Sequence, residues 1–255
     1  LTTLARAPKY SGISFSARGG GTGTNGQSLN DGLIVDLSRH MHGILEFNLE
    51  ERWVRVQAGL VKDKLNEFLK PHGLFFSPEL STSNRATIGG MINTDASGQG
   101  SLVYGKTSAH VLAVTAVLDD GSLLQAHPVQ GEALDAKLAD TGREGAIYRQ
   151  VLASARDKRA EVEATFPKLN RFLTGYDLKH VYDPACDGVD LSRLLCGSEG
   201  TLAFITEAKL DLSDAKVDAL AKLADKSLMK EQAAILKEAV EEARKSVKPE
   251  QKGRE

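Results

Sequence analysis

Residues 18–27, RGGGTGTNGQ, decide the fold of this chain: five of the eight residues from 19 to 26 are glycine. Glycine is favoured where the backbone takes a positive φ or must approach a ligand closely. The stretch also fits the dinucleotide pattern G-x-G-x-x-G, which requires a helix directly after its third glycine. Only QSLNDG separates Gly26 from the apolar run LIVDL at 33–37, so a helix has no room. We predict a glycine-rich ligand loop between two strands and no Rossmann unit.

Two further glycine clusters follow along the chain, one at residues 89–105 and a shorter one at Gly197 and Gly200. Three such clusters suggest one large ligand that the main chain grips at several points. Three ordinary surface turns are the alternative, and for any single cluster that alternative is favoured.

The hydrophobic periodicity outside these clusters alternates between strand and helix. Apolar residues at helical spacing predict one helix over 61–69, stopped by Pro71 and Gly73, and another around 147–155, ended by Pro167. The mixture, with a hairpin inside it, favours an α+β fold over a doubly wound parallel sheet. The predicted strands are a short one at 13–17, a buried one at 33–37, a half-exposed one at 53–58, a hairpin of 111–118 and 122–125, and two closing strands at 202–206 and 208–212.

The composition changes at about Ser213, after which no residue is aromatic and the only glycine is Gly253. Apolar residues at helical spacing among many charged ones predict a charged helical tail over 213–255. We therefore expect one domain over 1–212 followed by this tail.

Composition excludes several classes of function. The chain has 255 residues with 32 basic and 34 acidic side chains, so its formal charge of −2 argues against nucleic-acid binding through a basic surface. No apolar run approaches the ~20 residues of a membrane span, and the first residues carry no signal-peptide stretch. The two cysteines are too few for a four-thiolate cluster, so we expect no metal site and a cytoplasmic location. The chain does not begin with Met, so a fragment or a processed form is expected.

A second motif match lies at residues 100–107, GSLVYGKT, which fits the P-loop pattern G-x-x-x-x-G-K-[ST]. A P-loop follows a buried strand and begins a helix. Here a polar loop precedes the match and a strand-like run, HVLAVTAVL, follows it. A P-loop ATPase stays a minor alternative.

Taken together and in order, RGGGTGTNGQ (18–27), TIGGMINTDASGQGSLVYGKT (87–107) and CGSEGTLAFITEAKL (196–210) carry a family resemblance. They resemble the FAD-binding domain of FAD-linked oxidases of the vanillyl-alcohol oxidase type, which has two subdomains. Within that family the chain is most similar to bacterial D-2-hydroxyglutarate and D-lactate dehydrogenases that carry an additional iron–sulfur domain. The resemblance covers residues 1–212.

The resemblance implies a set of FAD contacts. The glycine loop would bind the diphosphate, the second motif would lie along the flavin ring, and residues 197–201 with Ile205 would close around the ribityl and adenosine parts. Thr22 stands where some relatives carry a histidine that bonds FAD covalently, so non-covalent FAD is expected. The implied contacts are Arg18, Gly19, Gly20, Gly21, Thr22, Gly23, Thr24, Asn25 and Gly26, then Pro78, Thr87, Gly89, Gly90, Asn93, Thr94, Ser97, Gly98, Tyr104, Gly105 and Thr107, and finally Gly200 and Ile205.

The resemblance also implies the reaction: hydride transfer from a D-2-hydroxy acid to FAD, and electron transfer to an iron–sulfur domain or a quinone-linked carrier. The family's first strand, its substrate cap and its iron–sulfur domain are expected to be missing from this chain. The catalytic base therefore stays unknown. The alternative is an FAD-binding fragment without turnover of its own.

Overall fold

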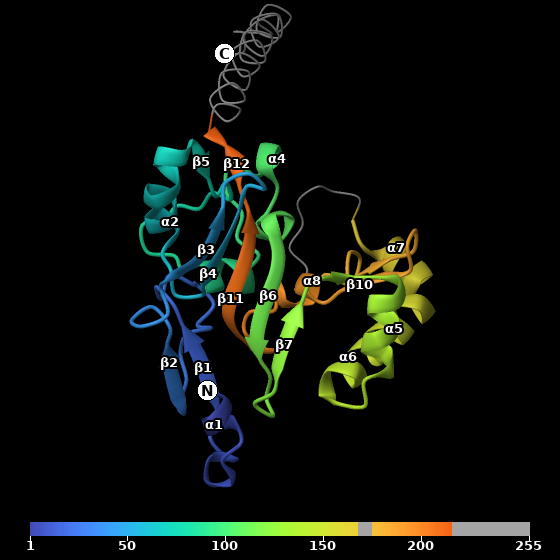
Figure 1. Cartoon of the computed structure of the whole chain (residues 1–255). Coiled ribbons are helices and arrows are strands. Elements are labelled where there is room, and N and C mark those ends of the chain that lie inside the picture. The colour runs from blue at the N-terminus through green and yellow to red at the C-terminus, as the bar shows by residue number, and fades with distance from the viewer. Residues whose placement is uncertain (168–174, 216–255) are drawn as a thin grey trace, which may run out of the picture. The chain divides into compact units, whose positions relative to one another are not determined.

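A computed structural model describes residues 1–167 and 175–215 of the chain (Figure 1). The chain divides into two compact units, Leu1–Ser213 and Asp214–Glu255. The helical tail predicted for 213–255 falls almost wholly outside the described residues. None of the described helices is long and apolar enough to cross a bilayer.

A five-stranded antiparallel sheet forms the centre of the first unit, in the order β3-β4-β11-β6-β7 (Figure 1). Its strands are β3 (Ile44–Asn48), β4 (Trp53–Gln57), β6 (Val111–Val117), β7 (Leu123–Ala126) and β11 (Phe204–Asp211). Val54 and Val56 of β4 are fully buried, while the residues between and beside them are half-exposed. The predicted half-exposed strand and the predicted β6–β7 hairpin are both confirmed.

The end of the domain differs from the expectation of two closing strands. β11 is one continuous strand that pairs with β4 on one side and β6 on the other. Its register against β6 shifts between Ile205 and Glu207, so an irregularity replaces the expected break. Such a bulge interrupts the alternation of apolar residues without ending the strand.

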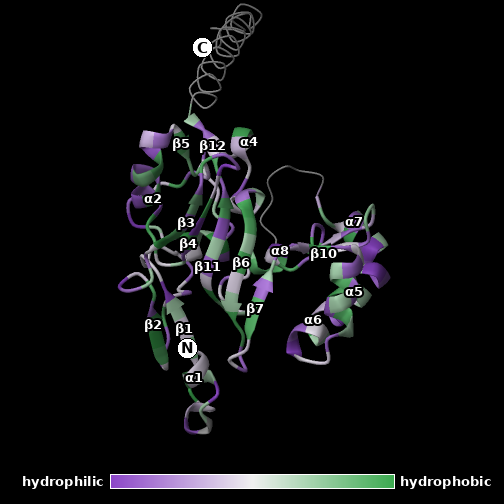
Figure 2. Cartoon of the chain, in the orientation of Figure 1, coloured by the Kyte–Doolittle hydropathy of each residue, from purple (hydrophilic) through white to green (hydrophobic). Residues whose placement is uncertain are grey.

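The glycine-rich loop connects two parallel strands, β1 (Phe15–Arg18) and β2 (Leu33–Asp36). The expected first strand is thus displaced by about two residues. β2 is apolar (Figure 2), but it is not buried: Leu33 is 41% and Ile34 40% exposed. The prediction of a buried strand was wrong because, in the part of the chain that the structure describes, β2 pairs with β1 alone and its second edge is open.

Helices and short elements complete the unit. α2 (Lys62–Leu69) confirms the first predicted helix and is followed by a 3₁₀ turn at Lys70–His72. The second predicted helix, by contrast, is interrupted at Lys158, giving α6 (Arg143–Asp157) and α7 (Arg159–Thr165). The other elements are α1 (Thr2–Ala5), η1 (Pro8–Tyr10), β5 (Leu74–Phe75), α3 (Ile88–Asn93), α4 (Ser101–Tyr104), η3 (Thr107–His110), β8 (Pro128–Val129), α5 (Gly131–Ala139), β9 (Tyr182–Asp183), β10 (Gly188–Asp190), α8 (Ser192–Leu195) and β12 (Ser213–Asp214).

One hydrophobic core joins the five-stranded sheet to helices that include α2, α3, α5 and α6, and the predicted α+β class is confirmed. Leu65 and Leu69 of α2 pack into it with Phe76 and α3 residues such as Ile92, all without solvent exposure. This core holds α3, and with it the second glycine cluster, against the sheet.

Replacing Leu65 by alanine should lower the free energy of unfolding by about 2–5 kcal/mol, because Leu65 is fully buried and its removal leaves a cavity. Denaturant unfolding measures this loss. Leu123→Ala on β7 is the matched control, since Leu123 is 61% exposed and its truncation should leave stability almost unchanged. Equal losses in the two variants would contradict the placement of α2 in the core.

Candidate functional site

A cavity of about 850 Å³ lies where the three glycine clusters meet. The loop after β1, helix α3 and the turn after α8 all contribute to its wall. The expected site residues that line it are Gly19, Gly20, Gly21, Thr22, Gly23, Thr24, Asn25, Thr87, Gly89, Gly90, Asn93, Thr94, Ser97, Gly200 and Ile205.

The remaining expected contacts do not line the cavity; several support its wall from behind. A Cβ on Gly21 would lie 2.7 Å from Arg18 Nη2, so the Arg18 guanidinium lies directly against the loop. The Thr107 hydroxyl is buried and donates to Ala96 O at 2.8 Å. The expected contacts outside the lining are Arg18, Gly26, Pro78, Gly98, Tyr104, Gly105 and Thr107.

The glycine loop runs in direct contact with the segment before α3. A Cβ on Gly19 would overlap Thr87 Oγ1, and a Cβ on Gly20 would overlap Arg85 O. Gly89 is equally constrained, because its Cβ would lie 2.8 Å from Ala58 Cβ. These glycines are therefore required by packing between protein segments, before any ligand is considered.

The same loop presents main-chain donors. In the described part of the chain, the backbone N–H groups of residues 19–24 donate to no protein acceptor, and that of Asn25 donates only to Gln27 Oε1 at 3.1 Å. A run of successive N–H groups without partners binds anions. A diphosphate group fits this loop, because it offers the oxygen acceptors that these donors need.

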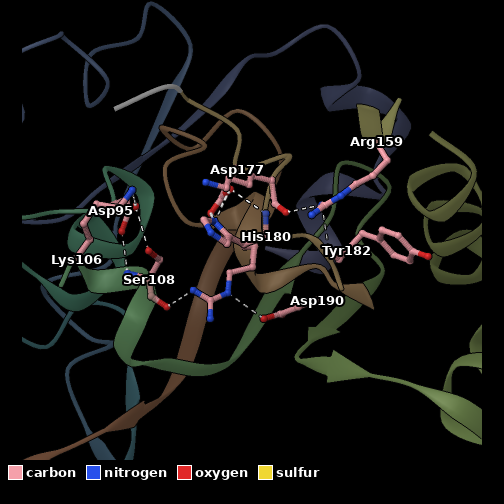
Figure 3. A network of polar contacts seen from close by, with 10 residues as sticks. Asp95, Lys106, Ser108, Arg159, Asp177, His180, Tyr182 and Asp190 are labelled. Carbon is pink, nitrogen blue, oxygen red and sulfur yellow. Dashed lines mark hydrogen bonds and ion pairs between the residues drawn. The ribbon is translucent and has the colours of Figure 1, made fainter. Parts of the chain in front are cut away.

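The opposite wall carries a buried ion pair (Figure 3). Asp95 takes a left-handed backbone, with φ of 46°, and its carboxylate accepts from the Ser108 N–H at 2.8 Å and the Ser108 hydroxyl at 3.1 Å. The Lys106 ammonium lies 2.5 Å from the same carboxylate, and both side chains are largely buried. These contacts hold the loop between α3 and β6 closed beside the cavity.

A third charged residue, Asp177, lines the cavity near this pair. Its carboxylate lies 2.7 Å from His180 Nδ1 and also accepts from the His180 N–H (Figure 3). Burial alone would raise the pKa of Asp177, but the hydrogen bonds and charge of His180, with Lys106 further away, hold that pKa below its usual value. Asp177 is thus ionised at neutral pH.

The structure does not support the P-loop alternative. The segment 100–107 forms the short helix α4 and a turn, with α3 before it, and η3 and then β6 after it. Lys106, the residue that would reach a phosphate, is engaged by Asp95. The strand, loop and helix that give a P-loop its geometry are thus not found at this motif.

Sequence reasoning missed several cavity residues. Asp95 lies inside the second motif, but an acidic residue among flavin contacts gave no signal of its own. Lys106 was singled out only as part of the P-loop match. Gln27 ends the first motif but was not among the expected contacts. Asp177 lies outside all three motifs, and only the folded structure brings it to the cavity.

Comparison with known proteins defines the class. A family described as an FAD binding domain matches residues 1–127. This match confirms FAD, the cofactor predicted from the sequence. The structure is also similar to that of alkyldihydroxyacetonephosphate synthase, with a TM-score of 0.54 and 16% sequence identity. This match covers 84% of the present chain and 30% of the synthase chain. This likeness confirms the FAD-binding oxidase-type fold.

Several bacterial dehydrogenases are similar in sequence to this chain. The chain is 64% identical over 214 residues to D-2-hydroxyglutarate dehydrogenase of Pantoea ananatis and 59% identical over 213 residues to that of Escherichia coli K12. Each match covers 84% of this chain but 21% of the relative, so the chain spans about a fifth of their length. A more distant relative, 30% identical over 212 residues, is D-lactate dehydrogenase of Archaeoglobus fulgidus, of which 36% is covered, against 83% of this chain.

Removing the Lys106 charge should destabilise the protein. In Lys106→Met, the buried Asp95 carboxylate loses its ionic partner, and we expect a loss of about 3–5 kcal/mol in denaturant unfolding. Lys64→Met removes a lysine from an exposed pair with Glu67 and should change stability little. Asp95→Asn in the Lys106→Met background should recover part of the lost stability. If Lys106→Met leaves the free energy of unfolding unchanged, the ion pair does not stabilise the fold.

Proposed function

We propose that the complete protein is an FAD-dependent dehydrogenase of a D-2-hydroxy acid and that this chain supplies its FAD site. The observation that carries the proposal is the cavity, where the main-chain donors of residues 19–24 meet the two other glycine clusters. The identity to D-2-hydroxyglutarate dehydrogenases supports D-2-hydroxyglutarate as substrate, with D-lactate as the second choice.

The lining residues fit the parts of FAD. The N–H groups of residues 19–24 would hold the diphosphate, which needs donors and no bulky side chain. Gly89, Gly90 and Ser97 offer small surfaces to a flat ring, and Asn93 and Thr94 offer hydrogen-bonding groups near it. When bound, FAD supplies the hydride acceptor that the reaction requires. Thr22 has no nucleophilic ring nitrogen, so the cofactor would be held without a covalent bond.

A second candidate function is FAD binding without turnover by this domain alone. The observation that favours it is the cavity lining, which contains no histidine among the described residues and a single lysine, Lys106, already paired with Asp95. The three described lining carboxylates, Asp95, Asp177 and Glu199, are each hydrogen-bonded to protein groups, so the described lining offers no unengaged base for a substrate hydroxyl. In this case the base would come from the rest of the complete protein.

The partners follow from the same proposal. The complete protein would pass electrons from FAD to an iron–sulfur domain or a quinone-linked carrier, and it would act in the cytoplasm. The small formal charge of −2 gives no support to a nucleic-acid partner.

Visible absorption of the purified complete protein tests the cofactor site. We expect two flavin bands that stay in the supernatant after acid precipitation, because the FAD is non-covalent. Gly20→Val should abolish flavin retention, since the new side chain would overlap Arg85 O, whereas Gly12→Val has no atom within 4 Å and should retain flavin. Flavin that precipitates with the protein would contradict the role given to Thr22.

Dye reduction tests the substrate. The complete protein should reduce an artificial electron acceptor with D-2-hydroxyglutarate, more slowly with D-lactate, and not with the L-enantiomers. This chain alone should reduce no dye with any of them. Turnover by the chain alone would overturn the second candidate function, and a colourless complete protein that takes up no FAD would overturn the first.

A further inference from the structure

Glu199 occupies an unusual position in the turn after α8. Its backbone is left-handed, with φ of 54°, and lies between Gly197 and Gly200, which have φ of 84° and 78°. Left-handed backbone is unfavourable for a residue with a Cβ, and such residues persist where the surrounding structure holds them, often at functional sites. The Glu199 N–H donates to Asn93 O at 2.8 Å, which fixes this turn to the end of α3.

The side chain of Glu199 reaches the glycine-rich loop. Its Oε2 accepts from Gln27 Nε2 at 2.6 Å, joining residues 172 positions apart in the sequence. The other end of the same amide, Gln27 Oε1, accepts from the Asn25 N–H at 3.1 Å. The Gln27 amide is therefore oriented from both ends, and both Gln27 and Glu199 line the cavity.

Among the described residues, this hydrogen bond is the one polar tie between the stretch 19–28 and a distant part of the domain. At the other end of the loop, the Asn30 side chain bonds Ser14 and Ser16 at the start of β1. Within residues 1–167 and 175–215, the only other hydrogen bond from residues 19–28 to a residue outside them is the Leu29 N–H to Gly26 O, which is local. A loop so rich in glycine has many conformations to lose when it binds a ligand. Fixing the loop in advance removes that loss from the binding step.

We propose that the hydrogen bond between Gln27 and Glu199 preorganises the glycine-rich loop for a diphosphate, which makes both residues positioning residues for the cofactor. This inference rests on the proposed function of the cavity as an FAD site. Neither residue needs to touch FAD for this effect. They act by holding the N–H groups of residues 19–24 in one arrangement.

Preorganisation of the loop and electrostatic repulsion predict opposite changes in FAD affinity when Glu199 is replaced. Glu199 places a negative charge beside a loop that would bind an anion, so repulsion alone predicts that FAD binds more tightly when Glu199 is replaced. Preorganisation predicts weaker binding, because the loop loses its tie. The direction of the change in affinity therefore separates the two effects.

The experiment is an FAD titration of the complete protein stripped of its flavin, followed by quenching of flavin fluorescence, with the dissociation rate measured in parallel. Glu199→Ala and Gln27→Ala should each weaken binding about tenfold, the loss expected for a hydrogen bond to a charged group, and the double variant should be no worse than either one. Glu199→Gln keeps an acceptor oxygen and should bind more tightly than Glu199→Ala. The thermal unfolding of the flavin-free protein should change little.

A swap of the two side chains is the decisive arm. Gln27→Glu places two carboxylates against each other and should bind FAD more weakly than Gln27→Ala. Adding Glu199→Gln restores a donor and an acceptor in reversed order, so the swapped protein should recover most of the affinity. Glu207→Ala and Gln57→Ala are matched controls, because Glu207 pairs with Arg55 and Gln57 accepts from Gly43 outside the cavity lining. Both should bind FAD as the wild type does.

The outcomes separate this inference from the proposed function. If the wild type binds no FAD, the cavity is not a flavin site and the proposed function fails. If the wild type binds FAD and Glu199→Ala binds it equally or more tightly, the FAD site stands and the positioning role is overturned. A swapped protein that stays as weak as Gln27→Glu would also overturn it.

Discussion

The passage of the glycine-rich loop over the backbone before α3 is the constraint on which the rest of the site depends. Gly19 and Gly20 lie so close to Thr87 and Arg85 that no side chain fits between the two segments. That contact brings the first and second glycine clusters to one place. The buried residues of α2 and α3 hold the second cluster still, and the loop is laid against it. The cavity is the space left between them.

The described lining of the cavity has a net negative charge. Its described lining carries three acidic side chains, Asp95, Asp177 and Glu199, and one lysine, Lys106, which is already paired. A surface of this charge does not attract a diphosphate through side chains. Under the proposed function, the main-chain N–H groups of the loop would hold the diphosphate, and these groups have a fixed direction only while the loop keeps its shape. The three acidic residues instead stabilise the cavity wall, since each of them is hydrogen-bonded to another protein group.

Helices and strands could be predicted from the sequence where one face of the element is buried. The alternation in β4 and the spacing in α2 follow directly from that burial, and both elements were predicted. β11 was predicted as two strands because its register irregularity breaks the alternation, and nothing in a single sequence separates a bulge from a turn. α6 ends at Lys158 without a proline or glycine, so the sequence contains no helix-stop signal at this position.

The site was predictable to the extent that it is made of main chain. Glycine marks where the backbone comes close, and most of the expected lining positions followed from that signal together with the family resemblance. The charged residues were not predictable, because their roles depend on partners far away in the sequence. Glu199 and Gln27 are 172 positions apart in the sequence and are neighbours only in the folded structure.

The exposed strand β2 has a consequence for handling the protein. Among the described residues, one edge of β2 is unpaired, and the apolar side chains of Leu33 and Ile34 are exposed, so the same strand of another molecule can pair with it. The isolated chain should therefore aggregate as its concentration rises.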